Sequence, residues 1–132
     1  MLIVGRTIAD WRQNNVVSPN PAKPFTFRIA TDGDTENVPW PRVISTIEMA
    51  ESDVAANVPF RMTDELLANE EEDSQVGLYV EALLDSHRGK AIFGERCVIP
   101  LLVGGRVTYE SDLGTVTKAT IEWEGLASWR PA

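Results

Sequence analysis

The chain has 132 residues, of which 43% are hydrophobic and 24% are charged, and its formal net charge is −8. A chain of this length forms one domain with its own core, so we treat residues 1–132 as a single domain. Twenty acidic against 12 basic residues oppose a protein that holds nucleic acid through its phosphates. The composition therefore predicts an acidic globular protein and excludes a disordered or fibrous chain.

Cysteine content and hydropathy indicate where the protein folds. Cys97 is the only cysteine, so no disulfide forms within the chain, which suits a reducing compartment such as the cytoplasm. The apolar start Leu2-Ile3-Val4 is too short for a signal peptide. No uninterrupted apolar stretch approaches the ~20 residues of a membrane span, so we expect none.

The first 24 residues combine a short helix with a proline-rich arm. Thr7 is a suitable cap for one or two helical turns, which Asn14-Asn15 ends. The segment 16–24 is then predicted to be extended, because its prolines fix φ and remove backbone donors. It is either a connector on its own subunit or an arm that reaches a neighbouring copy, and the second alternative makes three residues candidate interface residues: Pro19, Pro21 and Pro24.

Strict alternation over residues 25–31 predicts a strand that places Phe25, Phe27 and Ile29 on one face. The acidic segment 32–37 follows as a turn. It lacks the Gly and Glu that a calcium-binding EF-hand loop requires at its sixth and twelfth positions, so we interpret it as a solvated turn.

Trp40 lies between two prolines and cannot occupy a central strand. It is either a lid on the core or, together with Arg42, a contact residue at a subunit interface, where Trp and Arg are enriched. The β-branched residues of segment 43–49 predict a second strand.

Residues 51–72 give the weakest pattern. Segment 58–62 is typical of a short edge strand, and segment 63–67, with a capping Thr63 and two early acids, of one or two helical turns. An acidic run follows, which is either a solvated loop or a functional acidic surface. It comprises Glu70, Glu71, Glu72 and Asp73.

Residues 73–89 form the best-marked helix. Apolar positions recur with a 3.6-residue period, acids precede the first turn, and Arg88-Gly89 supplies a cation and a residue that tolerates positive φ. The predicted buried stripe consists of Val76, Tyr79, Val80, Leu83, Leu84 and His87. A helix with one apolar side needs a sheet to cover.

The C-terminal third predicts a β-meander. Gly104-Gly105 separates two apolar runs and predicts a two-residue hairpin, and Pro100 limits the first run to an edge strand or a bulge. Segment 115–125 is the final strand, with Trp123 on its apolar face and Glu122 and Glu124 on its polar face. These two glutamates extend the candidate acidic surface, and Trp129 in the tail is a candidate contact residue.

These elements predict a mainly β (α+β) fold: an antiparallel β-sandwich or barrel flanked by one helix at about residues 73–89. We expect no enzyme. His87 is the only histidine and lies on the apolar stripe, half-buried near the last helical carbonyls, while Cys97 lies in a strand pattern typical of a buried structural thiol. We expect no metal and no cofactor, since one Cys and one His exclude zinc spacing and no phosphate-binding glycine loop occurs.

The order of these parts resembles the tail-tube family of tailed bacteriophages and its relatives in contractile injection machines. The resemblance rests on the proline-rich arm, the first strand Phe25-Thr-Phe-Arg-Ile, the mid-chain helix and the Thr-rich strand 115–125. It implies a virion protein, made in the host cytoplasm, that stacks in rings of six subunits around a channel for DNA. Negative walls suit such a channel because they repel phosphates.

Two alternatives stay open at this point. The first is that the protein is another virion part, such as a tail terminator, a head–tail connector or a tail-tip ring. The second, from a different class, is a small cytoplasmic ligand-binding or adaptor domain that makes its contacts through Trp40 and the acidic loop. Self-association separates these classes, because a ring protein carries complementary patches on opposite faces and an adaptor does not.

Overall fold

The computed structural model describes residues 2–33, 38–39, 41–49, 58–68, 76–112 and 115–129. Six strands form one sheet in the order β1-β2-β3-β6-β5-β4. The elements are α1 (Leu2–Asn15), β1 (Thr26–Ile29), the 3-10 turn η1 (Ala30–Asp32), β2 (Arg42–Met49), β3 (Val58–Leu67), α2 (Val76–His87), β4 (Ile92–Phe93), β5 (Cys97–Asp112) and β6 (Thr115–Trp129).

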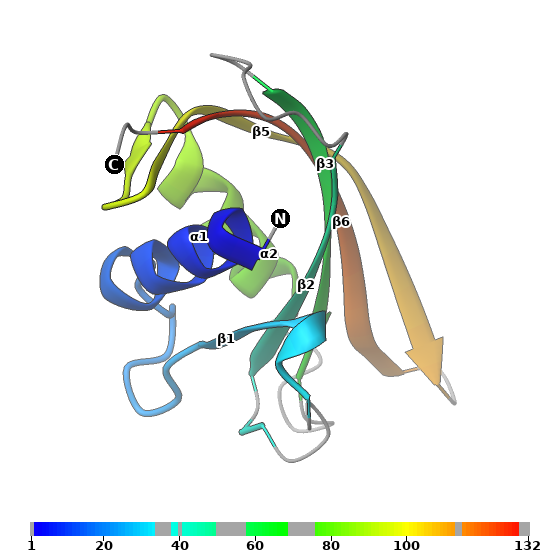
Figure 1. The fold of residues 1–132 in the computed structure, drawn as a ribbon. Coiled ribbons are helices and arrows are strands. Elements are labelled where there is room, and N and C mark those ends of the chain that lie inside the picture. The colour runs from blue at the N-terminus through cyan, green and yellow to red at the C-terminus, as the bar shows by residue number, and fades with distance from the viewer. Residues whose placement is uncertain are drawn as a thin grey trace.

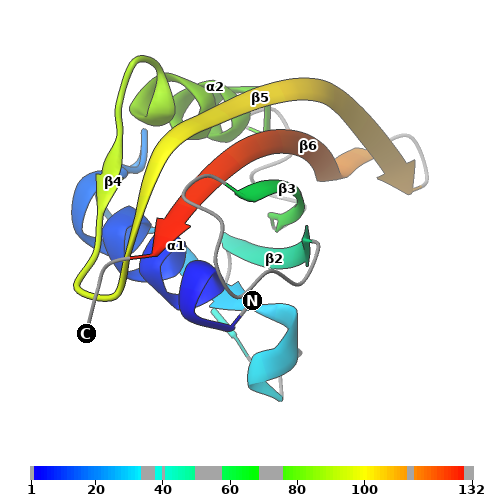
Figure 2. The ribbon, with the colours of Figure 1, turned by 45° about the horizontal axis from the view of Figure 1, so that its top comes forward.

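The sheet curls around the two helices. Both helices lie on its concave side, and no helix of the described residues lies on the opposite, convex face (Figure 1). Seen from above, β5 and β6 arch over the helices while β2 and β3 complete the curve (Figure 2). The mainly β class is confirmed, as a half-barrel with two helices. All neighbouring strands are antiparallel except β1 and β2, which are parallel.

The core fills the space between the helices and the concave face. The predicted stripe of α2 is confirmed at Val76, Tyr79, Val80, Leu83 and His87, which are buried, whereas Leu84 is half-buried against the core. Gly89 ends the helix region with φ 68°. The alternation predicted for the first strand is confirmed as well, because Phe25, Phe27 and Ile29 are buried.

Helix α1 is longer than predicted, with 14 residues in place of one or two turns. Val4, Ile8, Arg12 and Val16 recur every four residues and are buried, so the inner stripe contains an arginine. A buried charge is rare unless it is paired, so the sequence pattern did not indicate that Arg12 faces the core. The predicted helix was too short because the prediction placed its cap at Thr7, which left out the residues from Leu2 to Arg6. Thr7 is not a cap, since its hydroxyl donates to the Ile3 carbonyl at 2.7 Å.

Strand β3 replaces the strand and helix predicted for residues 58–67. Its inner face alternates Val58, Phe60, Met62, Asp64 and Leu66, all buried. Asp64 interrupts the apolar alternation, and this made the second half resemble a helix start.

The hairpin predicted at Gly104-Gly105 is wrong. Strand β5 continues through both glycines to Asp112, with a register shift between Gly104 and Val107. Gly104 is required for close packing, because a Cβ there would lie 3.2 Å from Trp123 Cζ3 and 2.3 Å from Leu84 Cδ2. The bulge predicted at Pro100 is confirmed by the register shift between Val98 and Leu101.

Candidate functional site: a buried ion pair and an open sheet edge

A buried ion pair joins α1 to the middle of the sheet. Arg12 donates from Nη1 to Asp64 Oδ1 at 2.9 Å and from Nη2 to Asp64 Oδ2 at 2.7 Å. Both residues are 0% exposed. Two parallel hydrogen bonds between charged groups offset the cost of removing both charges from water. The pair therefore fixes α1 on the concave face.

Ser45 and His87 complete this buried polar cluster, which we define as Arg12, Ser45, Asp64 and His87. The Ser45 hydroxyl donates to Asp64 Oδ1 at 2.5 Å, and Arg12 Nε donates to His87 Nε2 at 2.9 Å. The four residues come from β2, β3 and both helices. Hydrogen bonds within the cluster therefore connect both helices to the sheet.

His87 is more deeply buried than predicted, with an exposure of 2%. Its ring packs 4.8 Å from the ring of Trp11 and 5.0 Å from that of Trp123. Burial, and then the positive charge of Arg12, lower the pKa of His87 to about 3. Because Nε2 accepts from Arg12, the proton of the neutral ring lies on Nδ1.

The side chains of this cluster are engaged mainly with one another, although His87 and Ser45 are each among the residues that line a cavity, of about 430 Å³ and about 400 Å³. All four residues are at most 7% exposed, and Ser45 is the least buried of them. The Ser45 hydroxyl donates to Asp64 and accepts from Arg12, and these contacts occupy the positions that a catalytic base would need. Cys97 is buried, as predicted, and its thiol lies 3.4 Å from Thr7 Oγ1. Among the described residues, no group of three or more His, Cys, Asp and Glu side chains is arranged to hold a metal.

The open edge of β5 is the second notable feature. On one side β5 pairs with β6 almost throughout, but on the other it pairs with β4 only at Val98 and Ile99. Within the described part of the chain, no strand covers that side from Leu101 to Asp112. Unpaired N–H and C=O groups on an edge strand are a template for pairing with another chain.

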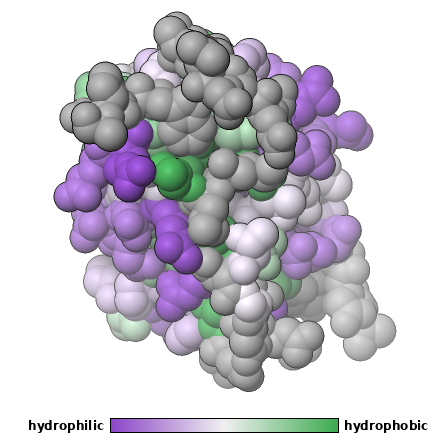
Figure 3. Space-filling model, in the orientation of Figure 1, coloured by the Kyte–Doolittle hydropathy of each residue, from purple (hydrophilic) through white to green (hydrophobic). Residues whose placement is uncertain are grey.

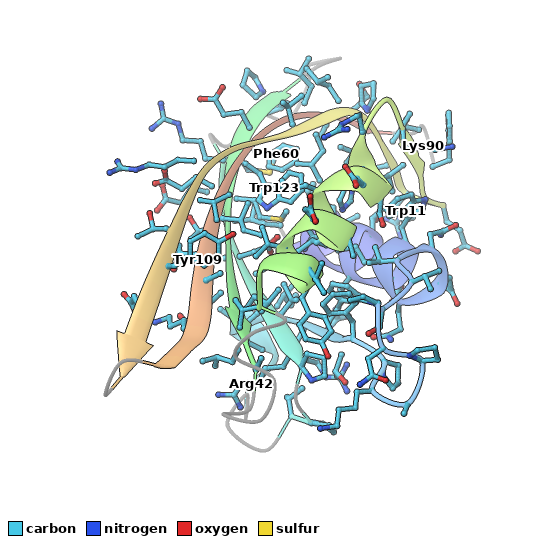
Figure 4. The ribbon with its side chains drawn as sticks, turned by 180° about the vertical axis from the view of Figure 1, so that it is seen from behind. Trp11, Arg42, Phe60, Lys90, Tyr109 and Trp123 are labelled. Atoms are coloured by element: carbon cyan, nitrogen blue, oxygen red, sulfur yellow. The ribbon has the colours of Figure 1, made fainter. Side chains whose placement is uncertain are left out.

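Exposed apolar side chains follow this open edge. Leu101, Val103 and Tyr109 are 47%, 53% and 49% exposed. Figure 4 shows Tyr109 on the part of the β5–β6 hairpin that projects beyond the helices, whereas Trp123 lies between the sheet and α2. Proteins usually blunt long edge strands with charges or proline, and β5 has Pro100 just before its open part and the exposed charges Arg106 and Glu110 within it.

The convex face is mixed in character. It carries part of the predicted acidic surface, but also the basic Arg61 of β3 and the exposed apolar Val103 of β5, which are both cross-strand partners of Glu124. Glu122 and Glu124 are exposed on it, on the side of β6 that faces away from the core. Lys118 on the same strand contacts Glu65 and Glu110, each at 3.4 Å. In the view of Figure 3, hydrophilic residues predominate over α1 at the left and along the convex side at the right.

The structure places the other predicted contact residues away from the open edge or leaves them outside the described residues. Pro19, Pro21 and Pro24 are exposed on the loop after α1, far from the projecting hairpin in Figure 1. That loop contains a turn held by Lys23 N–H donating to the Asn20 carbonyl at 3.0 Å. Arg42 is half-buried at the start of β2. Its contact role remains a prediction.

Five predicted site residues cannot be placed. Trp40 and the acidic run Glu70, Glu71, Glu72 and Asp73 lie outside the described residues. Trp129 is the last residue of β6, and only its backbone position is described.

Sequence reasoning missed Arg12, Ser45 and Asp64. One signal was available: Arg12 continues the four-residue spacing of Val4 and Ile8, and Asp64 continues the alternation of Phe60 and Met62. A cation and an anion, each on the apolar face of its own element, indicate a buried pair.

The chain matches no protein-family model and no curated protein. Within the described residues, neither helix has the length and apolar character needed to cross a membrane.

Proposed function

We propose that this protein is a structural component of a tailed-phage virion that associates with copies of itself into rings of the tail, as a conduit for DNA. Hexameric rings, neighbouring virion proteins and DNA that passes without sequence-specific binding belong to the same proposal. The protein is not an enzyme in this account. A terminator, connector or tail-tip ring is the same kind of assembly at another position.

The open edge of β5 is the observation that carries the proposal. An edge of this length with exposed apolar side chains favours association with another strand, and a copy of the same chain is the partner always present at matching concentration. The buried His87 supports the non-catalytic part, since its Nε2 is occupied by the hydrogen bond from Arg12 and only 2% of the residue is exposed.

The two faces of the sheet support a ring with its helices outside. Helices cover the concave face, so in a ring of sheets only the convex face remains for the channel. That face carries Glu122 and Glu124 beside the basic Arg61 and Lys118, and Lys118 is paired with Glu65 and Glu110. In this proposal the acidic side chains repel phosphates and let DNA slide without binding.

Negative-stain electron microscopy across a concentration series, beside sedimentation velocity, tests the proposal. We expect rings or short tubes with a central hole whose proportion rises with concentration. A monodisperse monomer at every concentration would overturn the proposal and favour the adaptor alternative.

A further inference from the structure

The sheet has a second open edge, on β2. Strand β1 pairs with β2 only at residues 42–45, and within the described residues no strand pairs with Thr46–Met49 on the side of β2 opposite β3. We propose that the open part of β5 in one copy adds to this open part of β2 in the next copy, so that the sheets of successive copies are joined edge to edge. The inference rests on the proposed self-association and names its acceptor site.

The two open stretches lie at the same level of the sheet. Cross-strand partners connect residues of β2 with residues of β5 through β3 and β6, along two rows. One row consists of Ile47, Met62, Trp123 and Gly104. The other consists of Met49, Phe60, Gly125 and Leu102. On one side of this level, strand β1 occupies the edge of β2, and on the other side of the level, β4 occupies the edge of β5. Copies placed side by side without a shift therefore bring open edge against open edge.

Strand direction also matches. Three successive antiparallel pairings, β2 with β3, β3 with β6 and β6 with β5, make β5 antiparallel to β2. A rotation about an axis parallel to the strands keeps each strand's direction, so β5 meets the β2 of the next copy as an antiparallel neighbour. The contact is heterologous, and such contacts close into rings or continue as filaments.

The side chains around both edges are complementary. Beside the open part of β2 lies a mainly apolar cavity of about 400 Å³, with Ile29, Ala30, Thr46 and Ile47 among its walls. An added strand covers this cavity and removes Leu101 and Val103 from solvent at its own edge, which contributes apolar burial to the contact.

Charge agrees with this arrangement. Glu48 is exposed on the open part of β2, and Arg106 is exposed on the open part of β5, close to the level at which the edges meet. Opposite charges across an interface steer the encounter and fix its register. The same edge of β5 meeting its own copy about a two-fold axis would place Arg106 near a second Arg106.

Two matched variants and one control test the inference. The donor variant Leu101→Lys/Val103→Lys places charges on the β5 edge, and the acceptor variant Ala30→Lys/Thr46→Lys places them on the β2 edge. All four positions are exposed, so both variants retain the fold, which circular dichroism verifies. The control, Phe93→Lys, changes a 71% exposed apolar residue of β4 outside both edges.

We expect each variant alone to sediment as a monomer at concentrations where the wild type and the control assemble. Mixed in equal amounts, the variants should form a dimer and nothing larger, because only one intact donor and one intact acceptor edge remain per pair. An acceptor variant that still dimerises alone would show pairing of β5 with β5 and overturn the inference. Ring formation by both variants would also overturn it, yet leave the proposed function standing, whereas a wild type that never assembles removes both.

Discussion

Arg12 and Asp64 form a bidentate ion pair with both side chains fully buried. Attraction between the two charges is strong in this environment, but each charge alone would be costly to bury. The pair therefore acts as an all-or-none connection between α1 and β3.

Replacing Arg12 with Met tests this connection. The substitution leaves the Asp64 carboxylate buried without its cation, so we expect the free energy of unfolding to fall by about 3–5 kcal/mol in urea denaturation. The double variant Arg12→Met/Asp64→Leu removes the orphaned charge and should recover part of that loss.

An exposed ion pair provides the control. Arg88 Nη2 lies 3.1 Å from Asp85 Oδ1, with side chains 79% and 61% exposed. Arg88→Met should cost less than about 1 kcal/mol, because water screens this pair. Equal losses for the Arg12 and Arg88 variants would contradict the buried pair.

Stability should depend on pH through His87. Its pKa is about 3 in the folded protein and near the ordinary 6.5 in the unfolded chain. Below pH 6.5 the unfolded chain binds a proton that the folded protein does not, so stability falls as the pH drops from 6.5 towards 3 and is fully present above 6.5.

The window between pH 6.5 and 5 isolates this contribution, because ordinary carboxylates titrate lower. There the slope due to His87 should approach about 1.4 kcal/mol per pH unit. His87→Gln keeps an acceptor for Arg12 and should remove that slope. An NMR titration in which His87 protonates near pH 6.5 would refute the buried neutral ring.

The core contact of α2 is tested with two leucines of the same helix. Leu83 is 0% exposed, and Leu83→Ala should cost about 2–5 kcal/mol through the lost contacts and the cavity left behind. Leu78 is 50% exposed, so Leu78→Ala should change the free energy of unfolding much less. Similar melting temperatures for the two variants would mean that α2 packs through another face.

Two glycines should respond to alanine with opposite signs. At Gly125 a Cβ would lie 2.5 Å from Phe60 Cζ and 2.9 Å from the Leu101 carbonyl oxygen, so Gly125→Ala should destabilise by about 1–3 kcal/mol. At Gly77, inside α2, a Cβ meets nothing within 4 Å, and Gly77→Ala should stabilise by about 0.5–1 kcal/mol. Differential scanning calorimetry measures both, and a stabilised Gly125→Ala variant would contradict the packing of Phe60 on β6.

Periodicity predicted the elements whose buried face is purely apolar. Spacing alone predicted β1, α2 and β6. Their core positions are all apolar, aromatic or small, with His87 as the one exception. Prediction failed where a charge occupies the core. The buried Arg12 on the first helix was not predicted, and Asp64 divided β3, since neither charge reveals its partner 52 residues away. The first helix was predicted too short for another reason, because the prediction placed its cap at Thr7.

The proposed assembly surface was less predictable for a different reason. Whether β5 is an edge strand depends on the order of the strands in the sheet, and local sequence patterns do not indicate that order. Gly104-Gly105 resembled a turn locally, whereas the neighbouring Trp123 and Leu84 explain Gly104 through packing. The exposure of Glu122 and Glu124, by contrast, follows from alternation along β6 alone.

Amide hydrogen exchange of the wild type, compared between dilute and concentrated protein, tests most directly whether β5 is the assembling edge. We predict that protection rises with concentration in the open part of β5, Leu101–Asp112, while amides of α2 keep the same exchange rates. Assembly without added protection in β5 would contradict the account, because the edge would then remain unpaired within the assembled particle.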